Sequence, residues 1–383
     1  MNALLSPHIP LVPFDAARAV HAGLSAVAAI DRLGPLFGGV LLREPPPDDA
    51  ARWHPHEIAG RALRFARPLT FTPYAATRPC SARCAFCSEN LRDDAAPGVP
   101  AATLRPGARY FDHLRAALAA LRDVPLAYSL SGLESTDDVA WFAELLHTLR
   151  DVAAGPAVEG SVLYTNGAGF AREPQRLLSA LRAFDLGWIE WSRHHDDAAA
   201  NQRLMRFRDG LAIAQDDGFT RALRAAVGAL PVKLVCIVQR DGIATPADVL
   251  RYVRHARSLG VDGVVFREFS ELPASYRANA TRRHIDAHRV RIDDLLPDCL
   301  ATPALRELLQ PGALTGGYYF WNARLHTADG FEVVFEKSDY GALHAHEDSG
   351  RIYKLVFHAN GHLCAGWQPD RHVLWRPCDH GRG

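Results

Sequence analysis

Short apolar runs alternate with amphipathic stretches through the middle of the chain. The apolar runs predict strands at Leu69–Thr72, Leu126–Leu130, Ser161–Thr165, Leu186–Trp191, Val232–Val238 and Gly263–Phe266. Apolar residues at helical spacing predict helices between them, at Tyr110–Leu121, Val139–Val152, Glu173–Ala183 and Ala247–Leu259. This alternation predicts an α/β fold in which helices cover a parallel sheet. The sheet is either an open doubly wound sheet or a complete or partial barrel, and in both the loops after the strand C-termini carry the chemistry.

The pattern differs on both sides of this region. Residues 1–65 mix a helical stretch, Ala16–Arg32, with a proline-rich acidic loop at 43–49. The tail is predicted to hold helical segments and then strands, at Tyr276–Leu296, Pro303–Leu309, Gly317–His326, Glu332–Glu336 and Arg351–His358. We therefore expect an N-terminal extension over 1–65, the βα region over 66–272 and a small α+β cap containing β-strands over 273–383.

Composition narrows the function classes. The 383 residues balance 43 Lys and Arg against 43 Asp and Glu, and 48% are hydrophobic, which is typical of an ordinary globular protein. Nothing in this balance favours a nucleic acid or a membrane surface as partner. The N-terminus lacks a basic segment, and no run reaches the roughly 18 apolar residues of a membrane helix. We therefore expect a cytoplasmic protein.

Three of the seven cysteines lie together after the first predicted strand, as Cys80-x3-Cys84-x2-Cys87. In a reducing cytosol such a cluster binds metal or performs chemistry. Three thiolates can hold three irons of a [4Fe–4S] cluster and leave the fourth iron to chelate a small molecule. A structural zinc site with a distant fourth ligand is the alternative, although zinc sites usually pair two CxxC knuckles.

The cysteine spacing, with Phe86 before the last cysteine, resembles the cluster loop of the radical S-adenosylmethionine (radical SAM) enzymes. The style of the motifs is that of the branch with the molybdenum-cofactor cyclase and the SPASM/twitch proteins. The resemblance covers about residues 66–272 and implies a partial (β/α)6 barrel. It also implies that the reduced cluster cleaves S-adenosylmethionine to a 5′-deoxyadenosyl radical that abstracts hydrogen from a substrate. The electron donor would be a flavodoxin or a ferredoxin.

Further motifs follow the next strands in the family's order. Leu130-Ser-Gly-Leu-Glu134 resembles the Gly-Gly-Glu element that holds the methionine ammonium, with Leu133 in place of the second glycine. Tyr164-Thr-Asn-Gly167 resembles the Thr-Asn-Gly turn of the cyclase branch, and a serine follows the fourth strand where the family contacts the cofactor. The resemblance thus implies cofactor contacts from Gly132, Glu134, Thr165 and Ser192.

Other polar residues near the strand ends are weaker candidates for substrate contact: His194, His195, Arg206, Arg267 and Tyr340. The histidines could instead lie at the surface beside a helix capped by Asp196 or Asp197. Arg267 could belong to a structural ion pair, and Tyr340 with His344, His346 and Glu347 could lie in a solvated loop.

The tail cysteines Cys364 and Cys378 resemble the auxiliary-cluster extension of some relatives. A second cluster needs three or four thiolates, and Cys299 is far away in the sequence, so we expect one cluster only. The leading hypothesis is a radical SAM enzyme acting on a small or medium substrate in a biosynthetic or tailoring step. The alternatives are a modifier of a ribosomally made peptide or protein with an auxiliary cluster, and a non-enzymatic iron–sulfur or zinc protein.

Overall fold

The computed structural model of the chain describes residues 11–12, 27–43, 50–91, 104–152, 155–272, 276–345 and 351–377. The chain forms two compact units that each combine distant segments. Unit 1 comprises Met1–Asp48, Ala82–Asp93 and Trp188–Leu343. Unit 2 comprises Asp49–Ser81, Asp94–Gly187 and His344–Gly383.

Unit 2 is built on a mixed sheet with the strand order β6-β5-β4-β13-β14-β15. Its parallel strands are β4 (Arg61–Tyr74), β5 (Leu126–Leu130), β6 (Val158–Thr165) and β13 (Arg351–His358). The antiparallel additions are β3 (Trp53–Ile58) on β4, and then β14 (Leu363–Cys364) and β15 (Val373–Trp375) beyond β13.

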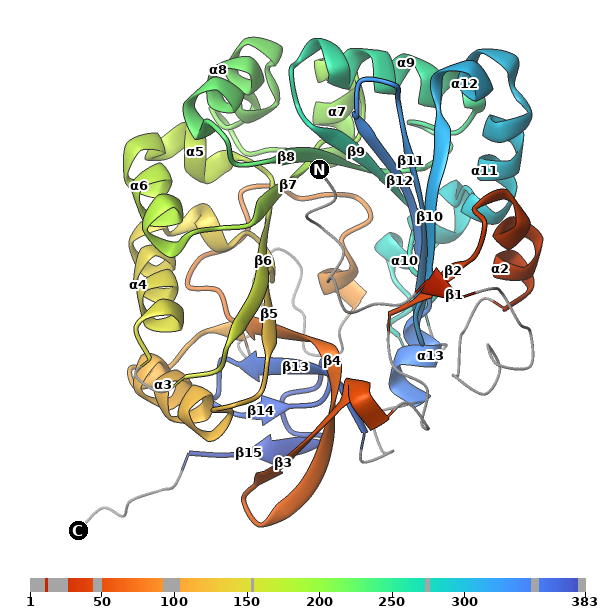
Figure 1. The fold of residues 1–383 in the computed structure, drawn as a ribbon. Coiled ribbons are helices and arrows are strands. Elements are labelled where there is room, and N and C mark those ends of the chain that lie inside the picture. The colour runs from red at the N-terminus through yellow and green to blue at the C-terminus, as the bar shows by residue number, and fades with distance from the viewer. Residues whose placement is uncertain are drawn as a thin grey trace. The chain divides into compact units, whose positions relative to one another are not determined.

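Helices follow the parallel strands of unit 2. They are α3 (Tyr110–Ala120), α4 (Val139–Arg150), α5 (Ala168–Arg172) and α6 (Pro174–Phe184), with a 3-10 turn, η5, at Ser135–Asp137. The α4 helix begins where the Asp138 carboxylate accepts a hydrogen bond from the backbone N–H of Trp141 at 3.2 Å. It buries Phe142, Leu145 and Leu149 along one face. Figure 1 shows α3, α4 and α6 along one side of β5 and β6.

The strands of unit 1 also combine parallel and antiparallel pairs, and β7 (Trp188–Ser192), β8 (Val232–Ile237), β9 (Gly263–Arg267) and β12 (Glu332–Ser338) are parallel. Beyond β12 the order continues through β11 (Phe320–His326), β10 (Gln310–Gly316), β2 (Val40–Leu42) and β1 (Leu11–Val12). Neither sheet closes on itself within the unit as described.

The helices of unit 1 are α2 (Val27–Leu33), α7 (Ala198–Met205), α8 (Asp217–Val227), α9 (Pro246–Ser258), α10 (Ala280–His288), α11 (Ile292–Ala301) and α12 (Pro303–Leu308), and α13 (Tyr340–Ala345) begins in it. Short 3-10 turns lie at Gly34–Leu36 (η1), Ser88–Leu91 (η3) and Ala212–Gln215 (η6). A capping box starts α9, because Thr245 and Asp248 each accept a backbone N–H from the other. Figure 1 shows α8 and α9 along one side of β8 and β9.

The structure confirms the α/β class and the six predicted parallel strands with their helices. It corrects three details. The first strand is much longer than predicted, because residues 61–74 form a hairpin with β3 around Ala59 and Gly60, both with positive φ. The predicted helix at Tyr276–Leu296 is two helices, α10 and α11. The structure also contains strands that the pattern does not predict: β1, β2, β10, β14 and β15.

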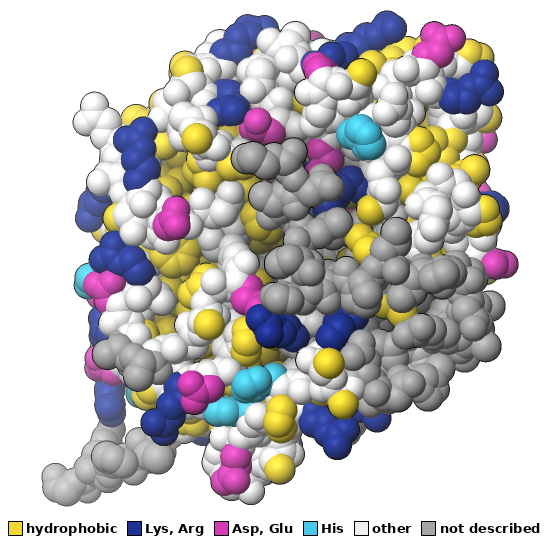
Figure 2. Space-filling view, in the orientation of Figure 1, with side chains coloured by type: hydrophobic (Ala, Val, Ile, Leu, Met, Phe, Trp, Pro, Cys, Tyr) yellow, Lys and Arg dark blue, Asp and Glu magenta, His cyan; other side chains and the backbone are white. Residues whose placement is uncertain are grey.

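The N-terminal part of the predicted helix Ala16–Arg32 lies outside the described residues, and α2 covers its end. None of the described helices is long and apolar enough to cross a membrane. On the face shown in Figure 2, acidic and basic side chains are scattered among one another, in keeping with the balanced composition.

Candidate functional site

The cysteine loop follows the C-terminal end of β4, as the sequence predicts. Cys80, Cys84 and Cys87 are each half-buried, and none of them forms a disulfide in the described chain. Within unit 1, the loop is held to the end of α7, where Arg83 N–H donates to the Met205 carbonyl at 2.9 Å. Cys87 N–H donates to the Cys84 carbonyl at 3.2 Å, which turns the chain between these two cysteines.

The thiols of this loop lie in surroundings that disfavour charge. Burial, and secondarily the neighbouring Glu89, raises the pKa of Cys87 to about 12. Burial, with Cys87 as the next contributor, also raises the pKa of Cys84, although the positive charge of Arg206 acts in the opposite direction. The protein alone therefore keeps both thiols protonated at neutral pH, and a bound metal would have to supply the positive charge that stabilises thiolates. These two thiols, neither of which forms a disulfide, have the character of metal ligands.

Phe86 fixes the middle of the loop in unit 1. Its ring packs edge-to-face on His194, with centroids 4.9 Å apart, and lies 5.6 Å from the ring of Phe269. His194 is 4% exposed, and burial, assisted by Arg267, lowers its pKa to about 3, so the imidazole is neutral. Its Nδ1 accepts the Ile237 N–H at 3.0 Å. His194 thus supports the loop by packing.

In unit 2, a buried carboxylate organises the ends of β5 and β6. Glu134 is 4% exposed and caps the η5 turn. Its Oε1 accepts hydrogen bonds from the hydroxyls of Thr136 at 2.5 Å and Thr165 at 2.8 Å. Its Oε2 accepts the Asn166 N–H at 2.5 Å. The two threonines and Asn166 therefore fix the position of the carboxylate.

Glu134 forms no ion pair with any described residue. Burial raises its pKa to about 7, and the nearby Asp137 adds to the shift, whereas the three hydrogen-bond donors oppose it. A buried carboxylate without a cationic partner is costly when ionised. A ligand carrying an ammonium group would supply the missing charge.

Asn166 connects this carboxylate to the first cysteine. Its backbone N–H bonds Glu134, and its side-chain Nδ2 donates to Ser81 Oγ at 2.8 Å and lies 3.8 Å from Cys80 Sγ. Ser81 N–H also donates to Asp137 Oδ2 at 2.6 Å, and Arg172 pairs with Asp137. Glu134 and the Cys80 sulfur are thus linked through one asparagine in unit 2.

The Gly132-Leu133 pair has the backbone conformation of a glycine-rich turn. Gly132 has φ of +114°, and a Cβ there would lie 2.8 Å from Cδ2 of Tyr74. Leu133, the next residue, has φ of +51°. This left-handed conformation costs a non-glycine residue roughly 1–2 kcal/mol, so the turn keeps the geometry without the glycine.

The remaining candidates lie in unit 1. Ser192 ends β7 and is half-buried. His195 accepts the Asp197 N–H at 2.9 Å and approaches Asp196 at 3.3 Å. Arg206 ends α7 with φ of +52°.

Arg267 and Tyr340 are tied into the structure of unit 1. Arg267 pairs with Glu336 at 2.7 Å and with Glu190 at 3.3 Å, which matches the structural alternative considered for it. Tyr340 begins α13, and its N–H donates to the Glu271 carbonyl at 3.0 Å. His344 is described only through its backbone, and His346 and Glu347 lie outside the described residues.

Sequence reasoning missed Ser81, Asp137 and Arg172, and it quoted Asn166 without assigning it a role. The available signal was weak: Asp137 stands three residues after Glu134 at the start of a helical turn, where carboxylates are common. The contact of Asn166 with Cys80 joins residues 86 positions apart, which no local pattern reveals.

The other cysteines are packed in the interior. Cys236 and Cys364 are each 0% exposed and Cys299 is 1% exposed. Cys364 Sγ lies 3.6 Å from the Pro369 carbonyl oxygen, and Cys378 lies outside the described residues. The expectation of a single cluster stays a prediction.

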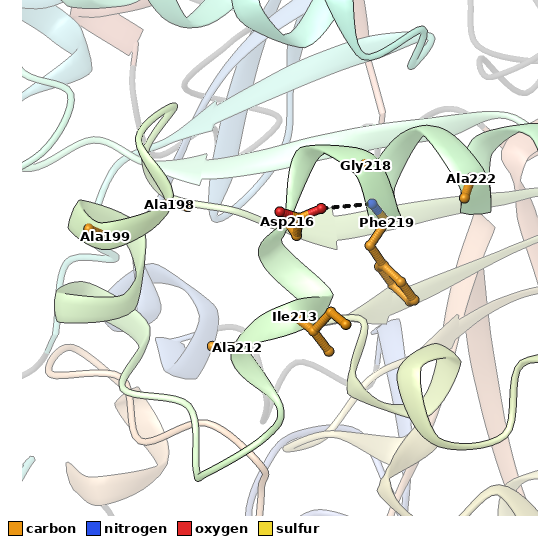
Figure 3. Close-up of a pocket in the computed structure, with 8 residues that line it drawn as sticks. All are labelled: Ala198, Ala199, Ala212, Ile213, Asp216, Gly218, Phe219 and Ala222. Atoms are coloured by element: carbon orange, nitrogen blue, oxygen red, sulfur yellow. Dashed lines mark hydrogen bonds between the residues drawn. The ribbon is translucent and has the colours of Figure 1, made fainter.

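One surface pocket lies away from these residues. Figure 3 shows it between the start of α7, η6 and the start of α8, lined by Ala198, Ala199, Ala212, Ile213, Asp216, Gly218, Phe219 and Ala222. Its volume is about 720 Å³. Its one charged side chain, Asp216, accepts the Phe219 N–H at 3.1 Å as the cap of α8. No predicted site residue lines this pocket.

No protein-family model matches the chain, and no curated protein matches it. Among solved structures, the chain is similar to Streptococcus suis SuiB bound to S-adenosylmethionine, with 14% identity and a TM-score of 0.44 over 78% of this chain and 60% of that chain. It is similar to native anSMEcpe with bound AdoMet, with 14% identity and a TM-score of 0.42 over 52% of each chain. It is also similar to Escherichia coli coproporphyrinogen III oxidase HemN, described as a radical SAM enzyme, with 14% identity and a TM-score of 0.35 over 67% of this chain and 66% of that chain. For SuiB bound to its precursor peptide SuiA, the match spans 53% of this chain and 40% of SuiB, at 15% identity and a TM-score of 0.37.

The turn before Glu134 yields a stability prediction. Gly132→Ala should lower the free energy of unfolding by about 2–4 kcal/mol, because it combines a strained φ with a clash against Tyr74. Gly60→Ala is the matched control in unit 2, since its φ is +76° and nothing lies within 4 Å of its Cβ position. It should cost only about 1–2 kcal/mol. Guanidinium unfolding curves of both variants check this, and equal losses would contradict the close packing at Tyr74.

Proposed function

We propose that this protein is a radical SAM enzyme in which Cys80, Cys84 and Cys87 hold one [4Fe–4S] cluster. The observation that carries the proposal is the hydrogen-bonded link from the buried, unpaired Glu134 through Asn166 to the Cys80 sulfur. This link places a carboxylate that could bind an ammonium group close to a cysteine that could bind the cluster. An enzyme that binds the amino acid part of S-adenosylmethionine at an iron needs both groups close together. The motif order in the sequence supports the same assignment.

Glu134 would bind the methionine ammonium of S-adenosylmethionine. Thr136 and Thr165 saturate one carboxylate oxygen and hold the plane of the group. Oε2 accepts only the Asn166 N–H from the described protein, so it keeps the capacity to accept a further donor. In this proposal Thr165 positions the Glu134 carboxylate by its hydrogen bond. Gly132 allows the backbone to pass close to Tyr74. Ser192 contacts the cofactor from the end of β7.

Asn166 would tune the cluster as well as the carboxylate. An amide N–H directed at a thiolate sulfur stabilises its negative charge, and such hydrogen bonds help to set cluster potentials. Asp137 holds Ser81, and through it the position of Asn166, while Arg172 balances the Asp137 charge. When bound, the cluster and S-adenosylmethionine supply one-electron cleavage of a C–S bond and a radical able to abstract hydrogen.

We infer a small or medium substrate, in a biosynthetic or tailoring reaction, and a flavodoxin or ferredoxin as electron donor. The competing hypothesis, modification of a ribosomally made peptide with a second cluster, requires tail cysteines that bind iron. The complete burial of Cys364 in β14 supports a packing role for that thiol. A non-enzymatic iron–sulfur or zinc protein would have no need of the carboxylate site next to Cys80.

Metal content is the first test. Anaerobically reconstituted protein should bind about four iron and four sulfide per chain, and Cys84→Ala should abolish this because a cluster with an open iron needs all three thiolates. Cys236→Ala is the control, since that thiol is in the core. Iron and sulfide analysis with the absorption spectrum measures both. Stoichiometric zinc without sulfide would refute the proposal.

Cofactor binding tests the role of Glu134. Glu134→Gln should weaken S-adenosylmethionine binding by roughly ten- to a hundred-fold, because a charge-assisted hydrogen bond is worth about 1.5–3 kcal/mol. In the wild type, affinity should fall as the pH drops below about 7, since the ammonium favours the ionised carboxylate and a proton must first leave it. The Gln variant should lack this pH dependence.

Calorimetric titration of the cluster-loaded protein between about pH 6 and pH 8 measures both effects. Glu159→Gln is a matched control, since that unit 2 carboxylate pairs with Arg67. Wild-type affinity in Glu134→Gln, with the cluster intact, would show that the cofactor binds elsewhere.

Iron content also separates the two enzyme hypotheses. Replacing Cys364 and Cys378 together with Ser should leave about four iron per chain, because we expect a single cluster. Iron analysis of the reconstituted double variant beside the wild type measures this. A loss of about half the iron from a wild type that binds roughly eight would instead establish a second cluster and favour the peptide modifier.

A further inference from the structure

Three side chains of types that can bind a metal meet in unit 1. Asp241 lies in the turn after β8, and His284 and His288 lie on α10. One ligand atom from each lies within 4.8 Å of the others. Neither the cysteine motif nor the proposed cofactor site uses these residues.

The helix brings the two histidines onto one face. Positions four apart are neighbours on an α-helix, and this spacing is used by histidine pairs that bind metal. Their rings are nearly parallel, with centroids 4.3 Å apart and an interplanar angle of 20°. The two rings therefore lie side by side on one face of α10.

His288 and Asp241 are close but not hydrogen-bonded. Nδ1 of His288 lies 3.2 Å from Oδ1 of Asp241, yet this buried nitrogen has no hydrogen-bond partner among the described residues. Two ligands bound to one metal at about 2.1 Å are themselves roughly 3.0–3.4 Å apart in octahedral or tetrahedral geometry. The distance between His288 Nδ1 and Asp241 Oδ1 therefore equals that between two ligand atoms bound to the same metal ion.

The turn after β8 holds Asp241 and offers a supporting residue. Gln239 N–H donates to the Ile243 carbonyl at 2.9 Å, and Gly242 N–H donates to the Gln239 carbonyl at 3.0 Å. The Gln239 side chain is 0% exposed, and its Oε1 lies 3.4 Å from Nε2 of His284. A histidine that binds metal usually donates its other ring N–H to such an oxygen. If Nε2 of His284 bonds Gln239, its Nδ1 is the ring nitrogen that remains to bind the ion.

The charges are compatible with a divalent cation. Asp241 contributes a negative charge, whereas Arg206 is a nearby positive group that opposes the ion. Two imidazoles and one carboxylate form a ligand set for zinc, iron, cobalt or nickel, and not one typical of magnesium or calcium.

We propose that Asp241, His284 and His288 form a binding site for a divalent transition-metal ion. The ion would connect α10, which carries the two histidines, to the turn after β8, which carries Asp241. The same helix region supports the segment after Cys87, because Asn279 Nδ2 donates to the Asn90 carbonyl at 2.7 Å and Arg277 N–H donates to that of Leu91 at 3.1 Å. The site is therefore placed to stabilise the cysteine loop within unit 1, and it does not rest on the proposed enzymatic function.

Cobalt binding to the full-length chain tests the site. Because the cysteine loop would also bind Co²⁺, the titration uses the chain with Cys80, Cys84 and Cys87 replaced by Ser. One equivalent of Co²⁺ should bind and give weak visible ligand-field bands without thiolate charge-transfer absorption. His284→Ala and Asp241→Asn, each added to this chain, should weaken binding by at least about 100-fold, beyond the 10–100-fold typical of losing a supporting residue.

Asp286→Asn is the matched control, because this carboxylate lies on the same helix and pairs with Arg282 at 3.2 Å. It should leave cobalt affinity unchanged. Thermal unfolding without metal checks that each variant folds, and Co²⁺ should raise the midpoint only where the three ligands are intact. The proposal would be overturned if the His284→Ala and Asp241→Asn variants both bound cobalt as tightly as the parent chain. It would also be overturned if the parent chain bound no cobalt below about 1 mM.

Discussion

The burial of the Glu134 carboxylate is the constraint on which the site of unit 2 depends. A carboxylate withdrawn from water must be hydrogen-bonded, and here three residues from the ends of β5 and β6 provide the donors. Those bonds in turn fix the Thr165-Asn166-Gly167 turn, whose asparagine reaches Cys80. The protein satisfies the hydrogen bonds of the carboxylate but not its charge. That difference is the reason why we propose that Glu134 binds a cationic ligand.

Whether the protein itself compensates a charge also distinguishes the other polar candidates from one another. Arg267 has carboxylate partners on both sides, and Lys233 of β8 pairs with Glu332 of β12 across the intervening strand β9. These charges are balanced within the fold, so they need no ligand. The raised pKa values of Cys84 and Cys87 show that their surroundings stabilise the thiolates too little, and the Nδ1 of His288 has no hydrogen-bond partner among the described residues. Each of these groups is one that a metal would stabilise. The groups that the protein itself stabilises too little are thus cysteine and histidine side chains, which are residue types that bind metals.

Much of the fold could be predicted because its signals are local. Each parallel strand is a short apolar run, and the cysteine spacing is visible in eight residues. The β3–β4 hairpin was missed because its turn, Ala59-Gly60, follows a stretch in which histidine and proline interrupt the apolar pattern. The site was only partly predicted for a different reason. The sequence indicated Glu134, but its support by Thr165 and Asn166 depends on two strands that meet only in the folded sheet.

His194 shows why a polar residue after a strand is ambiguous from sequence. In Ser192-Arg-His-His195 both histidines follow β7, and the pattern offers no way to rank them. In the structure, His194 is buried and its pKa is lowered to about 3, so its ring packs on Phe86 as a neutral aromatic. His195 instead accepts the Asp197 N–H at the start of α7. The direction in which each side chain leaves the backbone decides between packing and capping, and that direction is set by the residues from β8 and the cysteine loop that fill the space beside it.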